Sequence, residues 1–194
     1  MVKSILKLST VFTAVVAVVL SMSFTSCKNK SDEPEAAKVS RVELKLYANF
    51  SQDLLDLLTI NVQTSINAPG QIASVTHPLK NLENQVSLSA STFPATFKMP
   101  FAINGKRMPS VLKSEYVLGY EIEYRLIVYY EDGRDEVLSD VTAKYDHRSS
   151  MTINEPTAEE LQYYVGLTKD ELINNCSAVI NNVTVENGKV IVKG

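Results

Sequence analysis

Apolar and polar residues alternate with a period of two over most of the chain after residue 38. Alternation of this kind is typical of strands that bury one face in a core. The pattern predicts strands at 42–50, 58–66, 71–76, 85–91, 95–103 and 116–130. Pro94 and Pro100 should confine the 95–103 strand to a sheet edge or a bulge, because proline has no amide hydrogen to donate to a ladder.

The 116–130 segment gives the clearest strand pattern, and it is unusually long. At ~3.3 Å per residue it would extend for roughly 50 Å, whereas strands in globular proteins are usually ~3 to 10 residues long. We therefore expect it to bend, to bulge or to pass between two sheets. The Asp132-Gly133 pair predicts a hairpin turn within 131–134, followed by a returning strand that continues through 137–145.

Helical signals replace the alternation in the C-terminal part of the chain. Thr157–Glu160 and Thr168–Glu171 both have the residue types and spacing of a capping box. Gly166 lies where a glycine would end the first helix. These signals predict two short helices, near 158–165 and 169–176.

Many short strands separated by turn signals favour an antiparallel two-sheet architecture. We expect a mainly β fold, an antiparallel immunoglobulin-like sandwich with a short C-terminal helical segment and a closing hairpin around Asn187-Gly188. The likeness is one of architecture, since the chain has no tryptophan and so lacks the Cys…Trp…Cys pattern of true immunoglobulin domains. The 39–194 segment is long enough for one such domain.

The N-terminal residues have a different character. Lys3 and Lys7 precede the apolar stretch 11–20, which is too short for a comfortable membrane span and suits a secretory leader. The leader ends in Phe24-Thr25-Ser26-Cys27, which resembles the lipobox of bacterial lipoproteins. The resemblance implies that 1–26 is a signal peptide and that Cys27 is diacylated, becomes the mature N-terminus and anchors the protein to a membrane.

The segment that follows, 28–38, contains no large apolar residue and predicts a flexible tether with the lipidated cysteine at its start. Its acids, Asp32, Glu33 and Glu35, resemble the acidic tether that some Gram-negative anaerobes place after the lipidated cysteine for export to the cell surface. The body resembles small immunoglobulin-like sandwich lipoproteins of such bacteria. These resemblances imply an outer-membrane lipoprotein of the cell envelope, exposed at the surface; a solvated spacer with no address is the alternative.

The net charge of the chain excludes some classes of binding partner. The chain has 19 basic and 22 acidic side chains, and loss of Lys3 and Lys7 with the leader leaves 17 against 22, a net charge of −5. Such a surface argues against nucleic acid and against an anionic lipid leaflet as partners.

Cys176 has no second cysteine to pair with once Cys27 is acylated, and its spacing from Leu172 predicts a buried core residue.

Candidate catalytic chemistry is sparse. His77 and His147 are the only histidines, and neither has neighbours at metal-ligand spacing. Glu121 and Glu123 would lie ~6.6 to 7 Å apart on one strand face, within the range of an inverting glycosidase pair, although exposed strand glutamates are common. We therefore expect no enzyme, no catalytic residue, no metal and no cofactor. A small surface hydrolase with paired carboxylates is the alternative.

Tyrosine gives the strongest hint of binding, because exposed aromatic rings stack on sugars or anchor protein partners. Tyr129, Arg125 and Tyr116 are the candidate ligand-binding residues, although core packing is the alternative for most tyrosines near this hairpin. The sequence thus predicts a lipid-anchored, non-catalytic binding or assembly module for an envelope protein or a glycan. Another possibility is a structural subunit of a surface appendage completed by strand exchange, with a free groove or a detachable strand at 39–50.

Overall fold

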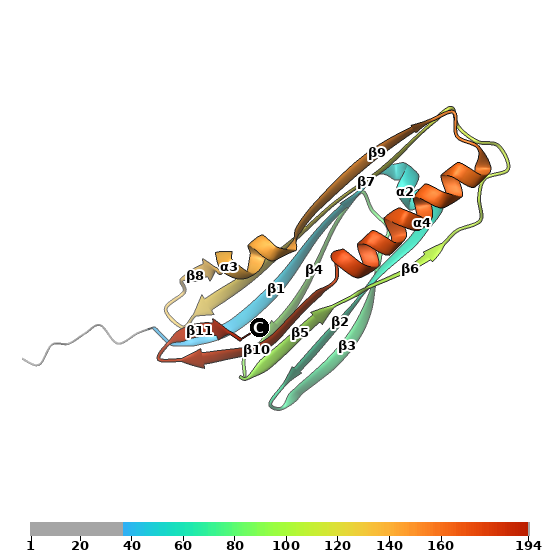
Figure 1. Ribbon diagram of the computed structural model, residues 1–194. Helices are drawn as coiled ribbons and strands as arrows, with labels where there is room; N and C mark the ends of the chain where they lie inside the picture. The colour runs from blue at the N-terminus through green and yellow to red at the C-terminus, as the bar shows by residue number, and fades with distance from the viewer. Residues whose placement is uncertain (1–36, 194) are drawn as a thin grey trace, which may run out of the picture. The chain divides into compact units, whose positions relative to one another are not determined.

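The computed structural model describes residues 37–193, so the predicted leader, the Cys27 acylation site and all but the last two tether residues lie outside the described part. Two antiparallel sheets face each other around one apolar core (Figure 1). Residues Ala36–Gly194 form one compact unit. All described strands and core side chains lie within this unit, so a chain that starts at residue 36 keeps the complete sandwich.

The five-stranded sheet has the order β4-β1-β7-β8, with β9 also paired to β7. Its strands are β1 (Val39–Phe50), β4 (Glu83–Ala90), β7 (Glu115–Tyr130), β8 (Asp135–Val137) and β9 (Asp146–Asn154). Leu44 of β1 lies opposite Leu126 of β7, and both side chains are fully buried. The period-two pattern therefore places one complete face of each long strand in the core.

The six-stranded sheet has the order β11-β10-β5-β2-β3, with β6 also paired to β2. Its strands are β2 (Leu58–Ala68), β3 (Gln71–Leu79), β5 (Ala95–Met99), β6 (Phe101–Gly105), β10 (Ala178–Glu186) and β11 (Lys189–Val192). Pro100 divides the predicted 95–103 strand into β5 and β6, because its missing amide hydrogen interrupts the ladder. The predicted edge position is wrong for β5, which lies between β10 and β2, whereas β6 pairs with β2 alone. β10 and β11 form the closing hairpin, in which Asn187 and Gly188 have φ of +52° and +73°, values required by a type I′ turn.

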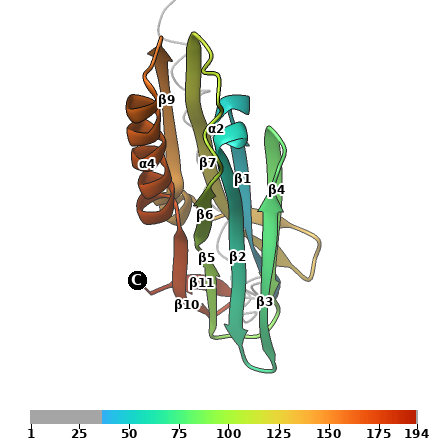
Figure 2. The same cartoon turned by 90° about the vertical axis from the view of Figure 1, so that its right-hand side faces the viewer.

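The helices lie at the margins of this sandwich. α2 (Gln52–Leu57) connects β1 to β2, and α3 (Ser139–Thr142) with the 3-10 turn η1 (Ala143–Tyr145) connects β8 to β9. α4 (Ala158–Asn175) runs directly into β10, and the two elements follow one another along one side of the domain (Figure 2). The mainly β antiparallel sandwich with a C-terminal helix and a closing hairpin, predicted from the sequence, is confirmed.

The prediction of two C-terminal helices is wrong, because α4 is one continuous helix of 18 residues. Its buried side chains are Leu161, Val165, Thr168 and Leu172, which follow one face across the position of Gly166. Thr168 does not cap a second helix; its hydroxyl donates to the Tyr164 carbonyl 3.0 Å away. Packing of an unbroken apolar face thus outweighs the helix-weakening effect of one glycine.

The prediction of a long returning strand through 137–145 is also wrong. β8 ends at Val137, and α3 and η1 fill the interval before β9 resumes pairing with the first half of β7. β7 itself stays in the five-stranded sheet, with β1 along one side and first β9, then β8 along the other. The turn at 131–133 is present, with Gly133 at φ +87°.

Cys176 is buried in the core, as its spacing predicted. Its side chain is fully buried, and desolvation raises the pKa of the thiol to about 11 even though a hydrogen bond with Tyr120 acts in the opposite direction. A thiol with such a pKa is almost entirely protonated at neutral pH and is a poor nucleophile.

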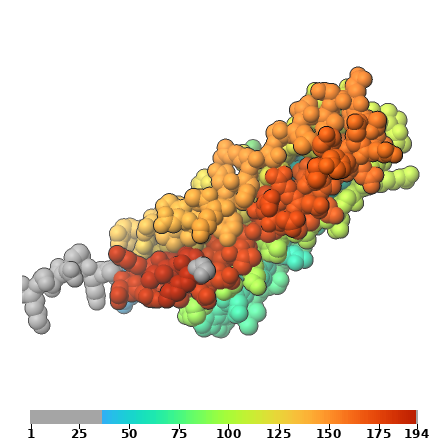
Figure 3. Space-filling view, in the orientation of Figure 1, coloured from blue at the N-terminus to red at the C-terminus, as the bar shows by residue number. Residues whose placement is uncertain are grey.

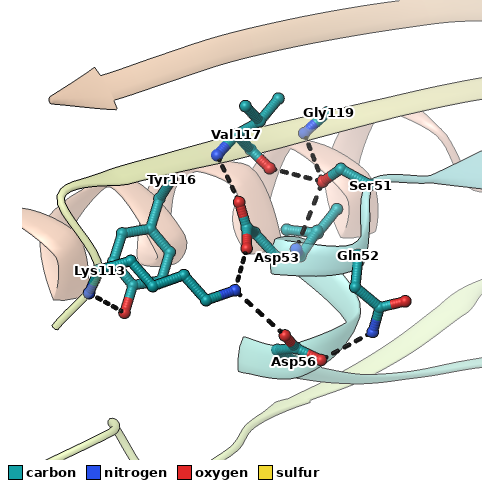
Figure 4. A network of polar contacts seen from close by, with 9 residues as sticks. Ser51, Gln52, Asp53, Asp56, Lys113, Tyr116, Val117 and Gly119 are labelled. Carbon is teal, nitrogen blue, oxygen red and sulfur yellow. Dashed lines mark hydrogen bonds and ion pairs between the residues drawn. The ribbon is translucent and has the colours of Figure 1, made fainter. Parts of the chain in front are cut away.

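A polar network fastens α2 to β7 and closes one end of the sandwich (Figure 4). The Ser51 hydroxyl donates to the Val117 carbonyl at 2.6 Å and accepts from the Gly119 and Leu54 amides at 3.0 and 3.3 Å. Asp53 accepts from the Val117 amide at 2.8 Å and pairs with Lys113 at 2.6 Å. These side chains satisfy backbone groups of β7 beyond the last pair that β1 makes with it.

Asp53→Asn should lower the free energy of unfolding by about 1 kcal/mol at pH 7, because it removes charge-assisted hydrogen bonds. Desolvation acts to raise the pKa of Asp53, but the bonds from Lys113 and Val117 and the Lys113 charge outweigh it and hold the pKa below its ordinary value. This carboxylate therefore stabilises the fold above the unfolded pKa, near 3.9, and loses its contribution as the pH falls through the folded pKa. Urea unfolding between pH 3 and 7 should show the two proteins converging at the acid end, and parallel profiles would contradict the assignment.

Candidate functional site

The outer face of the five-stranded sheet is charged, and its charges are paired with one another. Glu43 lies 3.9 Å from Arg41 and 3.8 Å from Lys45 on β1. On β7 and β9, Glu123 pairs with Arg125 at 2.6 Å and Glu121 with Arg148 at 3.1 Å. The charges of this face are therefore largely neutralised by neighbours on the same face, and no partner is needed to balance them.

Two of the predicted ligand-binding residues lie on this face, each already in contact with a neighbour. The Arg41 guanidinium lies 4.0 Å from the centre of the Tyr129 ring. Arg125 lies 4.8 Å from the centre of the Tyr47 ring while it pairs with Glu123. Cation–π contacts of this kind occupy ring faces that a sugar would otherwise stack on.

The third predicted residue, Tyr116, is not on this face. Its side chain is 2% exposed, and its hydroxyl accepts a hydrogen bond from the Lys113 amide at 3.3 Å. Tyr116 and Tyr129 stand near opposite ends of the 16-residue strand β7. The structure thus brings Tyr129 and Arg125 onto one surface and places Tyr116 in the core.

The residues considered for catalysis are dispersed. Glu121 and Glu123 lie on the paired outer face described above, each bound to an arginine. His77 is in the six-stranded sheet, with Nε2 3.0 Å from the Thr64 hydroxyl, whereas His147 is in the five-stranded sheet. Within residues 37–193, no three histidine, cysteine, aspartate or glutamate side chains gather as metal ligands.

A groove separates the two sheets on the side where β8 and β11 are the outer strands. It has a volume of about 370 Å³ and continues into a second hollow beside Tyr130 and Lys189. Leu138, Val141, Val190 and Val192 line it and pack against the core. Glu136 is at its rim and accepts a 2.9 Å hydrogen bond from the Tyr130 hydroxyl.

Over β2, β3, β5 and β6 the outer face of the six-stranded sheet differs sharply from that of the other sheet because it has almost no charge. In β2 the alternate residues from Leu58 to Ala68 are buried, so Thr59, Asn61, Gln63, Ser65 and Asn67 face outward. The strand register adds Ser74 and Thr76 from β3, Thr96 and Lys98 from β5, and Asn104 from β6. Lys98 is the only charged side chain in this set.

A shallow hollow of about 530 Å³ lies on this neutral face. Its lining includes Asn67 at the centre, Ser65 and Thr96 beside it, Lys98, and Asn181 from β10. Asn67 on β2 is flanked by Thr96 of β5 on one side and by Ile72 of β3 on the other, and all three are outward positions of the sheet. This hollow concentrates uncharged donors and acceptors on a rigid sheet.

The residues predicted from the sequence as a binding site do not include this surface, although the sequence contains a signal for it. From Leu57 to Gly105 the chain contains only three charged residues, Lys80, Glu83 and Lys98. The polar positions of these strands are instead asparagine, glutamine, serine and threonine. The low charge of this segment therefore marks the neutral face in the sequence, whereas the positions of the tyrosines do not.

Comparison of the chain with protein-family models, with curated proteins and with solved structures gives no match. Among the helices of residues 37–193, none has the length and apolar character that a membrane crossing requires.

Proposed function

We propose that the protein is a lipid-anchored, non-catalytic binding module of the cell envelope, whose contact surface is the neutral outer face of the six-stranded sheet. The observation that carries the binding part of the proposal is the amide- and hydroxyl-rich surface around Asn67, in which Lys98 is the one charged lining residue. The anchoring part rests on the leader, the lipobox-like sequence before Cys27 and the acidic tether. Both parts together describe a rigid sandwich that presents one sheet face to a ligand.

The chemistry of this face favours a neutral, hydroxyl-rich ligand, which in an envelope is a glycan. Asparagine, glutamine, serine and threonine side chains offer both donors and acceptors to sugar hydroxyls without the desolvation cost of a charge. Ile72 and Val179 are the large apolar side chains that the face exposes, at 86% and 43%. Protein interfaces are normally centred on aromatic or arginine anchors, which the outward positions of β2, β3 and β5 do not supply.

The other two surfaces support binding less well. On the five-stranded sheet, Arg41 and Arg125 already cover tyrosine rings and neutralise acids, so a ligand would have to displace existing contacts. The groove between β8 and β11 is lined by valines and leucine that continue the core, with acids at its rim. Neither surface presents uncommitted neutral hydrogen-bonding groups in the density found around Asn67.

Asn67→Ala should weaken binding of a neutral polysaccharide by about five- to tenfold, because a lost hydrogen bond is worth roughly 1 to 1.5 kcal/mol. The body, residues 36–194, can be tested by affinity electrophoresis in gels that contain a neutral α-glucan, a neutral β-glucan or an anionic polysaccharide. Asn154→Ala, an exposed asparagine on β9 of the other sheet, is the matched control and should bind like the parent protein.

The expected result is retardation by a neutral polymer that is clearly reduced in Asn67→Ala and unchanged in Asn154→Ala. Equal retardation of all three proteins, or retardation by the anionic polymer alone, would refute the assignment of the neutral face. If circular dichroism shows that the protein is folded and none of the three polymers retards it, the proposal that the ligand is a glycan is refuted.

A further inference from the structure

β3 is an edge strand with unusually little protection against pairing. It pairs with β2 on one side only and contains nine residues, none of them charged. Natural proteins normally guard such edges by keeping them short or by placing charges on them. On the opposite side of the domain that rule is followed: β8 has three residues with Asp135 and Glu136, and β11 has four that begin at Lys189.

The geometry of the β2–β3 hairpin identifies which backbone groups are free. The turn has two residues, Pro69 and Gly70, so Ala68 and Gln71 form the hydrogen-bonded pair that flanks it. Hydrogen-bonded and open pairs alternate from there, which turns the N–H and C=O groups of residues 72, 74 and 76 toward the free edge. Pro78 falls on an open pair opposite Asn61, a position consistent with its missing amide hydrogen.

The same strand exposes apolar side chains on both of its faces. Ile72 is 86% exposed and lies on the outer face, opposite Asn67. Val75 is 52% exposed and lies on the inner face, opposite the buried Thr64. In Figure 3 the β2–β3 hairpin forms the lower margin of the surface in view. A strand added at this margin would cover both side chains at once.

We propose that β3 pairs with β3 of a second copy of this chain, antiparallel and about a two-fold axis at Ser74, to join two six-stranded sheets into one. This register makes hydrogen-bonded pairs between the two Ser74 residues and between Ile72 and Thr76 of the second copy. It gives about six main-chain hydrogen bonds at two per pair, and Pro78, which cannot donate, limits the ladder. Ile72 then packs on Thr76 of the second copy, and Val75 on Ala73.

Charge favours a second copy as the occupant. Two bodies that share a net negative charge repel one another except where their contact surfaces are neutral. β3 contains no aspartate, glutamate, lysine or arginine, so antiparallel pairing about Ser74 brings no charged residue of one β3 against one of the other. An isologous contact needs a surface complementary to itself, and an uncharged strand paired antiparallel with itself meets that requirement. The proposal concerns the edge of the sheet and does not rest on glycan binding; Ile72 and Ser74 belong to both surfaces, because they also line the hollow on the sheet face.

Ser74→Lys tests the pairing, because it places two ammonium groups against each other at the axis. Ser74 is exposed in the monomer, so the substitution should hardly change the stability of the monomer. Sedimentation velocity of the full chain in detergent, and of residues 36–194 without it, should give the mass of a dimer for the parent. We expect Ser74→Lys to raise the dissociation constant of the dimer at least about tenfold. Thr59→Lys adds the same charge to the same sheet but on β2, and it should remain dimeric.

Cross-linking tests the register. Residues in a hydrogen-bonded antiparallel pair have Cα atoms about 5.5 Å apart, so Ser74→Cys should be joined to its copy by a short bismaleimide. Ser87→Cys, on the exposed side of β4, is the matched control and should not be joined. The proposal would be overturned by a parent protein that is monomeric at about 100 μM. Dimers that persist in Ser74→Lys, or cross-linking through position 87 in place of 74, would overturn it as well. Dissociation by Thr59→Lys would instead assign the contact to the sheet face and would also overturn it.

Discussion

Tyr124→Ala should destabilise the sandwich by about 4 kcal/mol or more, a large part of the stability expected for a domain of this size. Tyr124 is fully buried in the middle of β7. Its hydroxyl lies 3.3 Å from the Met99 carbonyl of β5 and 3.0 Å from the Cys176 carbonyl at the end of α4. One side chain thus joins the five-stranded sheet to the six-stranded sheet and to the C-terminal helix.

Truncation to alanine removes both the ring and the hydroxyl. Loss of a buried aromatic ring usually costs about 3 to 5 kcal/mol, through lost transfer energy and the cavity that remains. The neighbouring Tyr145 ring, 5.6 Å away in an edge-to-face arrangement, loses its partner as well. Desolvation raises the pKa of Tyr124 above its ordinary value, so the hydroxyl keeps its proton and can donate at neutral pH.

Tyr124→Phe separates the two contributions. It keeps the ring and should cost only about 1 to 2 kcal/mol, because the two buried carbonyls lose their donor. Equilibrium urea unfolding of residues 36–194, followed by far-UV circular dichroism, measures both variants against the parent. Equal losses for alanine and phenylalanine would show that the hydroxyl and not the ring carries the effect, and a loss below 2 kcal/mol in Tyr124→Ala would contradict the central position of this residue.

The parts of the fold that follow from local pattern were predictable from the sequence. β1 and β7 extend over the segments where period-two alternation is strongest, and Leu44 and Leu126 are buried as that alternation requires. The Asn187-Gly188 turn has the positive φ angles that this dipeptide favours. In these cases the residue types alone decide between exposure and burial, without information from distant parts of the chain.

The parts that depend on distant contacts were not predictable in this way. Gly166 is a sound local signal for a helix end, but it is overridden because Val165 and Thr168 pack into a core whose other half comes from the sheets. α3 interrupts the predicted returning strand, since its N-cap Leu138 and its Val141 pack against the core as partly buried side chains. Local propensity cannot reveal which surface a segment will meet.

The candidate site shows the same division. Tyr116 and Tyr129 stand on the same strand, and the period-two alternation puts them on opposite faces, with Tyr116 on the buried one. The position of Arg41 over the Tyr129 ring depends instead on the pairing of β1 with β7. The neutral face, in contrast, was accessible as composition, because Asn67 and its neighbours belong to a segment nearly free of charge. Its shape, a hollow shared by β2, β3, β5 and β10, required the strand order.

Cys27→Ala should abolish membrane retention while it leaves the sandwich folded. Cys27 lies outside the described residues, and its role is proposed from the lipobox-like sequence that it ends. Two acyl chains bind a bilayer stably, at ~0.8 kcal/mol per buried CH₂, whereas a single chain binds only marginally. Removal of the proposed acylation site should therefore shift the protein from almost entirely membrane-bound to almost entirely released.

Metabolic labelling with radioactive palmitate, followed by membrane fractionation, measures both consequences in a Gram-negative host. The parent should carry label and sediment with the outer membrane, and Cys27→Ala should carry none. Cys176→Ala is the matched control: this cysteine is buried within the core and its thiol has a raised pKa, so the label should persist. Label that survives in Cys27→Ala, or is lost in Cys176→Ala, would contradict acylation at Cys27. Because the described core begins at β1, unchanged urea unfolding of the released body would separate loss of the anchor from loss of the fold.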